Sequence, residues 1–186
     1  LTLKRCVTRC RDLDVDPAAP WTDPLATTKR ALRALARRWL ALAAEIAELD
    51  AGLRALTQAA TPRLLARPGV GPHTAAILLA CAGDNPERIG SEAALAALCG
   101  VSPVEASSGR VQRHRLNRGG DRQANCALFI IALARLRTDP RTRAYIERRT
   151  REGRSLKEIL RCLKRYLVRE LYPLLIADLR AAATPP

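Results

Sequence analysis

Residues 32–56 read LRALARRWLALAAEIAELDAGLRAL, and this stretch decides the fold class. Large apolar residues recur at alternating spacings of three and four, so every a and d position of a heptad repeat is filled. These positions are Leu32, Leu35, Trp39, Leu42, Ile46, Leu49, Leu53 and Leu56. The spacing predicts one long helix over residues 27–60, which Thr27 or Thr28 caps and Pro62 stops.

The repeat has two interpretations. It can be a coiled coil that joins two subunits, or it can pack within one chain as a hairpin or bundle helix. Four consecutive heptads favour the coiled coil, because that length is typical of helices that pair through an a/d seam. We therefore expect a homo-oligomer that assembles through this helix.

Composition extends the helical prediction to the rest of the chain. The sequence is 48% hydrophobic but only 3% aromatic, so alanine and leucine, both strong helix formers, supply most apolar surface. We expect an all-α (mainly α) protein with a linker or domain tail over residues 1–26, a coiled-coil helix over 27–60, a compact helical domain over 61–175 and a tail over 176–186. The chain opens on Leu1 and contains no methionine, which suggests a fragment of a longer protein.

Composition also narrows the location of the protein. No run of about 18 apolar residues occurs, so we expect no membrane partner. The six cysteines form no Cys-x-x-Cys pair, and their spacing fits neither a zinc site nor a small disulfide framework. A reducing, cytoplasmic location follows as an expectation.

Positive charge is concentrated at one end of the chain. The net charge of +14 divides into +3 for residues 1–60, −1 for 61–109 and +12 for 110–186. Basic helices are predicted over residues 141–171. Such an excess predicts a polyanionic partner, usually nucleic acid. An anionic membrane surface and a basic face that only meets solvent are the alternatives.

Residues 62–82 predict a helix-hairpin-helix. A short helix runs into Pro68-Gly-Val-Gly71, and Pro72 suits the first turn of a second helix. In this interpretation the hairpin of Gly69, Val70 and Gly71 offers backbone N–H groups to a phosphate backbone. The alternative is an ordinary turn between two helices.

The loop over residues 100–122 carries the candidate chemistry. Two serines, Ser107 and Ser108, stand directly before a dense basic cluster. The cluster comprises Arg110, Arg113, His114, Arg115, Arg118 and Arg122. Guanidinium groups match phosphate oxygens two at a time, and a serine beside them can bind a phosphate or attack it. The alternative is that these serines only close a turn.

Five stretches together resemble a known family. They are residues 68–75 (PGVGPHTA), 99–109 (CGVSPVEASSG), 113–125 (RHRLNRGGDRQAN), 139–145 (DPRTRAY) and 161–166 (RCLKRY). In this order, after a coiled-coil helix, they resemble the C-terminal helical domain of the insertion-sequence-110 transposases (the 110/116/902 group). The resemblance covers residues 27 to about 175.

The resemblance implies a bacterial, nucleoid-associated transposase that carries out DNA transposition and recombination. The implied partners are DNA and a structured guide RNA, so the reaction is RNA-guided. The family's nucleophile is the serine of the Ser-Gly pair, which forms a transient phosphoserine link to DNA. Counted from Pro103, the family's serine corresponds to Ser108, and Ser107 is its neighbour.

One part of the family pattern has no match. Family members carry an N-terminal RuvC-like (DEDD) domain whose four acidic residues hold Mg²⁺, and nothing in this sequence resembles it. We therefore expect no metal ligands and no cofactor in these residues, and binding and self-association without strand exchange from this chain alone. The alternatives are a non-catalytic helix-hairpin-helix module that binds nucleic acid, and a decayed transposase remnant.

Overall fold

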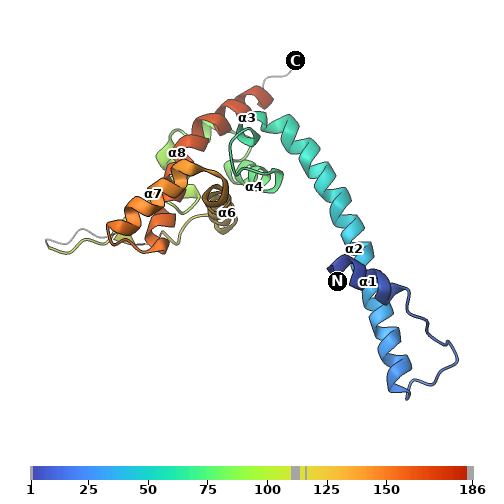
Figure 1. Cartoon of the computed structure of the whole chain (residues 1–186). Coiled ribbons are helices and arrows are strands. Elements are labelled where there is room, and N and C mark those ends of the chain that lie inside the picture. Colours follow the sequence, from blue (N-terminus) through green and yellow to red (C-terminus); the bar gives the residue numbers. More distant parts are fainter. Residues whose placement is uncertain (1, 110–113, 116, 184–186) are drawn as a thin grey trace. The chain divides into compact units, whose positions relative to one another are not determined.

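The computed structural model describes residues 2–109, 114–115 and 117–183 and divides the chain into two compact units, Leu1–Gly52 and Leu53–Pro186 (Figure 1). The elements are α1 (Leu3–Arg11), α2 (Pro24–Ala60), α3 (Pro62–Leu65), α4 (Pro72–Ala82), the 3-10 turn η1 (Pro86–Arg88), α5 (Glu92–Leu98), β1 (Val104–Glu105), β2 (His114–Arg115), α6 (Arg122–Thr138), α7 (Pro140–Arg151) and α8 (Leu156–Ala183). The all-α prediction is confirmed, since the strands of the described part form one two-stranded sheet.

The first unit contains a helix that the sequence did not predict. Residues 3–11, expected as linker, form α1, because their apolar side chains are spaced to lie on one face of a helix. The segment between α1 and α2 is held to α2 by Arg30, whose guanidinium donates to the carbonyl of Ala19 at 2.6 Å and lies 4.8 Å from the centre of the Trp21 ring. Of the hydrophobic side chains in this unit's described part, only Ala26 and Ala36 are buried.

Helix α2 starts three residues earlier than predicted. Its first turn contains Pro24, which tolerates the start of a helix because no N–H is needed there. The Asp23 carboxylate accepts from the N–H of Leu25 at 2.9 Å, so Asp23 supplies the side-chain acceptor at this end. Capping by Thr27 or Thr28 was wrong: both hydroxyls donate to carbonyls of preceding residues.

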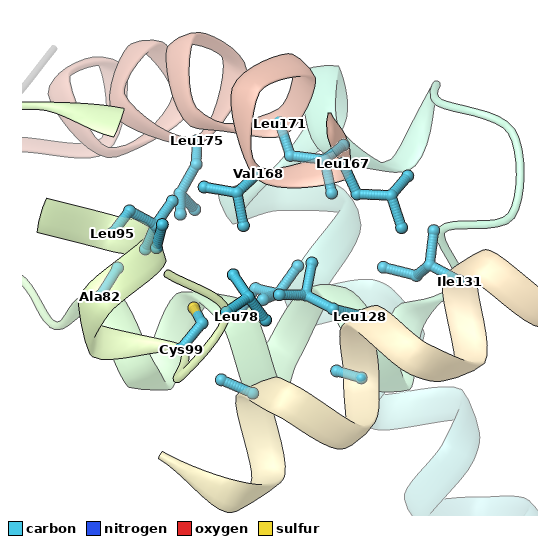
Figure 2. Packing of buried hydrophobic residues seen from close by; sticks show 14 of the residues in the cluster. Leu78, Ala82, Leu95, Cys99, Leu128, Ile131, Leu167, Val168, Leu171 and Leu175 are labelled. Atoms are coloured by element: carbon cyan, nitrogen blue, oxygen red, sulfur yellow. The ribbon is translucent and has the colours of Figure 1, made fainter. Parts of the chain in front are cut away.

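The second unit is built around α8. This helix packs against α3, α5, α6 and α7, and α4 packs against α6. Figure 2 shows Leu78 and Leu128 beneath Val168, Leu171 and Leu175 of α8. All five side chains are buried, so the apolar face of α8 forms one side of the core.

The predicted end of the domain was wrong. A tail was expected from residue 176, but α8 continues through Pro173 to Ala183. A proline removes one helical hydrogen bond, and that cost is offset here because Ile176 and Leu179 on the next turns are buried in the core. Asp178, in the same segment, is also fully buried.

Three helices of the second unit start with a side-chain acceptor. Ser91, Asp121 and Asp139 each accept a backbone N–H from the first turn of α5, α6 and α7, respectively. Serine and aspartate side chains commonly accept the backbone N–H groups of the first turn, which have no acceptor within the helix. The Asp139-Pro140 step separates α6 from α7.

Candidate nucleic-acid interface

The serine loop is a β-hairpin. Strands β1 and β2 pair antiparallel, with Val104 opposite Arg115 and Glu105 opposite His114. Ser107 and Ser108 lie in the connection between the strands, and both are exposed. The next residue, Gly109, has φ of 57°, a conformation that favours glycine. Both serines are therefore exposed in the part of the hairpin that precedes Gly109.

The base of the hairpin is fixed by contact between two glycine backbones. A Cβ on Gly120 would overlap the N and Cα of Gly100 and lie 2.8 Å from the carbonyl oxygen of Leu98. Gly100 itself has φ of 64°. The N–H of Asp121 donates to the Leu98 carbonyl at 2.7 Å, so the end of α5 and the start of α6 are joined directly. Only glycine at position 120 permits this approach.

Asn125 adds a polar link beneath the hairpin. Its amide donates to the carbonyls of Cys99 at 2.9 Å and Gly100 at 3.0 Å. Its oxygen accepts from the Lys164 ammonium of α8 at 2.6 Å. Burial lowers the pKa of Lys164, and the nearby Arg161 lowers it further. The hairpin is thus anchored to α6 and α8, which places it on the rigid part of the unit.

A second amide secures the strand that leaves the hairpin. Asn117 donates to the Ser102 hydroxyl at 2.9 Å, while its oxygen accepts from the N–H of Gly119 at 2.9 Å. The two strands are consequently linked by side chains as well as by the short ladder. Sequence reasoning missed Asn117, Asn125 and Lys164 as site residues. The available signal was two amides flanking a Gly-Gly pair within 113–125.

Exposed cations surround this base. Arg115, Arg118 and Arg122 are exposed, and Arg161 lies one turn before Lys164 just as Arg122 lies one turn before Asn125. We name Arg118, Arg122 and Arg161 the hairpin-base cluster. No carboxylate forms an ion pair with these three side chains among the described residues, so their charge is available to an anion. Arg110 and Arg113, also predicted to contact nucleic acid, lie outside the described residues.

His114 is exposed in β2, opposite Glu105. Its position on the hairpin is compatible with a phosphate contact, and its role stays a prediction.

Other arginines of the basic segment have structural roles instead. Arg165 and Arg169 of α8 both pair with Glu92 at the start of α5. Arg135 is almost buried and forms a two-pronged ion pair with Glu170, which also accepts from Arg67 at 2.9 Å. These contacts tie α8 to α5, α6 and the segment after α3. The uniform basic face expected from the sequence therefore divides into paired and unpaired cations.

The glycine hairpin between α3 and α4 packs closely on α6. Gly69 has φ of 79°, and a Cβ there would lie 3.0 Å from the carbonyl oxygen of Ile131. The N–H of Val70 donates to the Arg67 carbonyl at 3.1 Å, and that of Gly71 donates to the Thr74 hydroxyl at 3.0 Å. Both amides thus have acceptors inside the protein. Phosphate binding by this hairpin stays a prediction.

Two negative observations concern the described residues. No group of three His, Cys, Asp or Glu side chains is placed to hold a metal ion. No helix in the same part of the chain combines the length and the apolar character needed to cross a bilayer.

Comparison with known proteins identifies the family of this chain. The family model described as the IS116/IS110/IS902 transposase family matches residues 61–147, which span α3 to α7 and include the hairpin. The chain belongs to this transposase family. Its residues are 35% identical over 130 residues to the uncharacterized 43.6 kDa protein of insertion element IS110 from Streptomyces coelicolor. They are 31% identical over 144 residues to the uncharacterized 42 kDa protein of insertion element IS900 from Mycobacterium paratuberculosis.

The match covers most of this chain but a small part of the family relatives. The two alignments include 68% and 76% of the chain, and 32% and 36% of the IS110 and IS900 proteins. The chain therefore spans about a third of the length of these two relatives. The family resemblance expected from the five motif stretches is confirmed.

Proposed function

We propose that this chain is the DNA-binding, serine-bearing part of a transposase, and that Ser108 is the nucleophile of DNA strand exchange. The observation that carries the proposal is the hairpin: an exposed Ser108 lies in its connection, and its base is fixed by Gly100, Gly120 and Asn125. Because its base is fixed, the hairpin can hold the exposed serine in one position against a DNA phosphate, as an attacking group requires.

The chemistry is phosphodiester exchange. The Ser108 oxygen forms a bond to phosphorus while the bond from phosphorus to a deoxyribose oxygen breaks. A general base takes the serine proton, and the deoxyribose oxygen gains a proton and leaves as a hydroxyl. The phosphoserine link keeps the bond energy, so the reverse attack by a new deoxyribose hydroxyl rejoins DNA without an external energy source. Ser107, its neighbour, is proposed to contact the phosphate.

The hairpin-base cluster supplies the electrostatic part. Arg118, Arg122 and Arg161 are exposed and form no ion pair in the described part, although Arg161 is close enough to Glu158 to lower its pKa, so they can neutralise phosphates next to the one attacked. Arg110, Arg113, His114 and Arg115 belong to the same proposed surface by sequence. Each phosphate contact releases a counterion, so DNA affinity should fall steeply as salt rises.

Three further elements complete the proposal. The chain acts as a homo-oligomer that assembles through α2, a structured RNA guides it to DNA, and Mg²⁺ bound by an acidic domain polarises the reacting phosphate. The exposed heptad positions of α2 support the first element. The second and third rest on the family to which the chain belongs.

A covalent-trapping assay tests the nucleophile. The chain would be joined to a four-carboxylate nuclease domain of the same family and supplied with labelled donor and target DNA, guide RNA and Mg²⁺. Denaturing gels would then compare the parent with Ser108→Ala and with the matched neighbour Ser107→Ala. We expect a protein–DNA adduct in the parent and in Ser107→Ala, and none in Ser108→Ala.

Binding measured in parallel separates the alternatives. Adducts that persist in Ser108→Ala would reject this serine as the nucleophile. If no version forms an adduct while the isolated chain still binds DNA by fluorescence anisotropy, the chain is a non-catalytic binding module or a remnant. Absence of salt-sensitive DNA binding would reject the proposal altogether.

A further inference from the structure

The outward face of α2 is an apolar stripe without a partner in this unit. Six side chains of the first unit make up the stripe: Leu32, Leu35, Trp39, Leu42, Ile46 and Leu49. Their exposed fractions lie between 39% for Trp39 and 66% for Leu49. Of the buried hydrophobic side chains in the described part of the unit, Ala26 lies on another face, and Ala36, at an e position, borders the stripe on one side. The stripe is therefore left open.

A second copy of α2 is the occupant that this stripe fits. The exposed positions keep a strict a/d alternation, which is the pattern that two helices of the same kind use to interlock side chains. The proposed function already includes self-association through α2, and the orientation of the two copies rests on that self-association. The charges that flank the stripe decide both orientation and alignment.

These charges differ between the two ends of the helix. With Leu32 at an a position, Arg38 and Glu45 occupy g positions, and Lys29 and Asp50 occupy e positions. The cations thus lie toward the start of α2 and the carboxylates toward its end. Arg38 and Glu45 are both exposed, on an edge that is open to a partner.

A parallel arrangement places like charges together. In a parallel in-register pair, each g position faces the e position five residues later on the partner. Glu45 would then face Asp50 of the second copy, twice by symmetry, while Arg38 would face an alanine, Ala43. This arrangement has two repulsive contacts and no compensating ion pair at these positions.

An antiparallel arrangement pairs the same charges favourably, in one register. Antiparallel helices pair g with g and e with e, and an a layer meets a d layer. If Trp39 meets Leu42 of the second copy, Arg38 faces Glu45 and Lys29 faces Asp50. The outer layers within the stripe are then Leu35 with Ile46 and Leu32 with Leu49.

Neighbouring registers lose these ion pairs. A shift that makes Trp39 meet Leu49 of the second copy places Glu45 opposite Glu45. A shift in the other direction, with Trp39 against Leu35, places Arg38 opposite Arg38. Like charges directly opposite each other destabilise a helix pair, so both alternatives are disfavoured.

We propose that two copies of this chain associate through an antiparallel α2 coiled coil in which Trp39 of each copy packs against Leu42 of the other. The twofold axis lies between these central layers, and two Arg38–Glu45 ion pairs fix the direction and the register. Lys29 and Asp50 support the same alignment.

Charge exchange in the intact 186-residue chain tests the orientation. Sedimentation equilibrium at low salt would give the dimer dissociation constant of the parent, of Arg38→Glu, of Glu45→Arg and of the double variant. Each single change turns two attractive contacts into repulsive ones, so we expect the dissociation constant to rise by about tenfold or more. The double variant should return close to the parent. Both residues are exposed, so the fold should be unaffected.

Mixing the two single variants gives the sharpest comparison. In the antiparallel register, a heterodimer of Arg38→Glu with Glu45→Arg has opposite charges at both g pairs, so an equimolar mixture should dimerise as tightly as the parent. A tighter dimer for Glu45→Arg alone would overturn the proposal, because only the parallel arrangement gains from an arginine facing Asp50. A parent that stays monomeric at about 100 μM, or forms only a higher oligomer, would overturn it too.

The outcome is independent of the catalytic proposal. DNA affinity of the same variants, measured by anisotropy at fixed chain concentration, reports on the second unit. Loss of the serine adduct would leave the α2 assembly standing, and failure of the charge exchange would leave the nucleophile untouched.

Discussion

The two units treat their apolar side chains in opposite ways. In the second unit, Leu64, Leu128 and Ile131 are fully buried, and the apolar face of α8 is covered by α3, α5, α6 and α7. In the first unit the large apolar side chains of α2 are exposed, and only small alanines are buried among the hydrophobic residues described there. Both α2 and α8 nevertheless have sequences that place apolar residues on one face of the helix and polar residues on the other.

This difference shows what helical periodicity does and does not specify. Periodicity indicates which face of a helix is apolar, but it does not identify the surface that covers that face. For α8 the cover comes from the same chain. For α2 the strict heptad spacing and the charges at its edges point to another copy of the chain. Substitutions in each unit can test whether the second unit is stable through contacts within its own chain and whether α2 depends on a second copy.

The largest effect is expected at the hairpin base. Gly120→Ala places a Cβ against the backbone of Gly100, where no side chain can move aside. Backbone displacement in a packed region should reduce the free energy of unfolding of the second unit by about 3 kcal/mol or more. Urea unfolding followed by circular dichroism measures it.

The neighbouring glycine provides the matched control. A Cβ on Gly119 would meet the Asn117 side-chain oxygen only at the ordinary contact distance of 3.5 Å. Gly119→Ala should therefore change the unfolding free energy by less than about 1 kcal/mol. Equal losses in both variants would show that the close approach of Gly100 and Gly120 does not determine stability.

The next effect concerns Asp178, the buried carboxylate of α8. It accepts from the N–H of Leu64 at 3.0 Å and from the Arg63 guanidinium at 3.1 Å, at the start of α3. Asp178→Ala leaves the buried Leu64 amide without its acceptor, so we expect a loss of about 2–4 kcal/mol in unfolding free energy. Thermal and urea unfolding of the chain would measure this.

Arg63→Ala separates the two contacts. Arg63 is 52% exposed, so the loss of its ion pair alone should cost less than about 1 kcal/mol. If Arg63→Ala were as damaging as Asp178→Ala, the ion pair rather than the buried amide contact would secure α3 to α8.

A substitution on α2 should affect association between chains and not the stability of the second unit. Leu42→Glu places a carboxylate in the centre of the apolar stripe, so it should weaken self-association by about 2–3 kcal/mol while leaving the unfolding of the second unit unchanged. Ala44→Glu adds the same charge on a different face and is the control. Sedimentation equilibrium measures association. Unchanged association in Leu42→Glu would show that the stripe is not the interface.

Three helices of the second unit start at short polar caps, Ser91, Asp121 and Asp139, of a kind that a sequence can indicate. Those signals are local. The passage of α8 through Pro173 was not predictable, since it depends on tertiary burial of Ile176 and Leu179. Local proline chemistry indicates a stop, and distant packing overrides it.

The candidate site was predictable only in part. The serines and arginines were evident from composition, and the family motifs located them. Which cations are available was not evident, because Arg165 pairs with Glu92, which lies 73 residues earlier in the chain. The hydrogen bond from Lys164 to Asn125 joins residues 39 positions apart, so it could not be predicted from the sequence for the same reason. Pairing across such distances depends on the packing of α8, not on any local pattern.

The smallest predicted effect is a pH dependence confined to the second unit. Hydrogen bonds from Arg135, and then from Arg67, lower the pKa of Glu170 below its ordinary value of 4.5, against an opposing effect of burial. A carboxyl with a lowered pKa in the folded state stabilises the fold above pH 4.5, and this contribution is lost as the pH falls through the folded-state pKa. Glu170→Gln should therefore cost about 1–2 kcal/mol at neutral pH and flatten the acid side of the stability profile. Glu147→Gln, at an exposed carboxylate of α7, is the control and should keep the parental profile. Urea unfolding between pH 3 and pH 7 measures all three proteins, and an equally steep acid loss in Glu170→Gln would assign the pH dependence to other carboxylates.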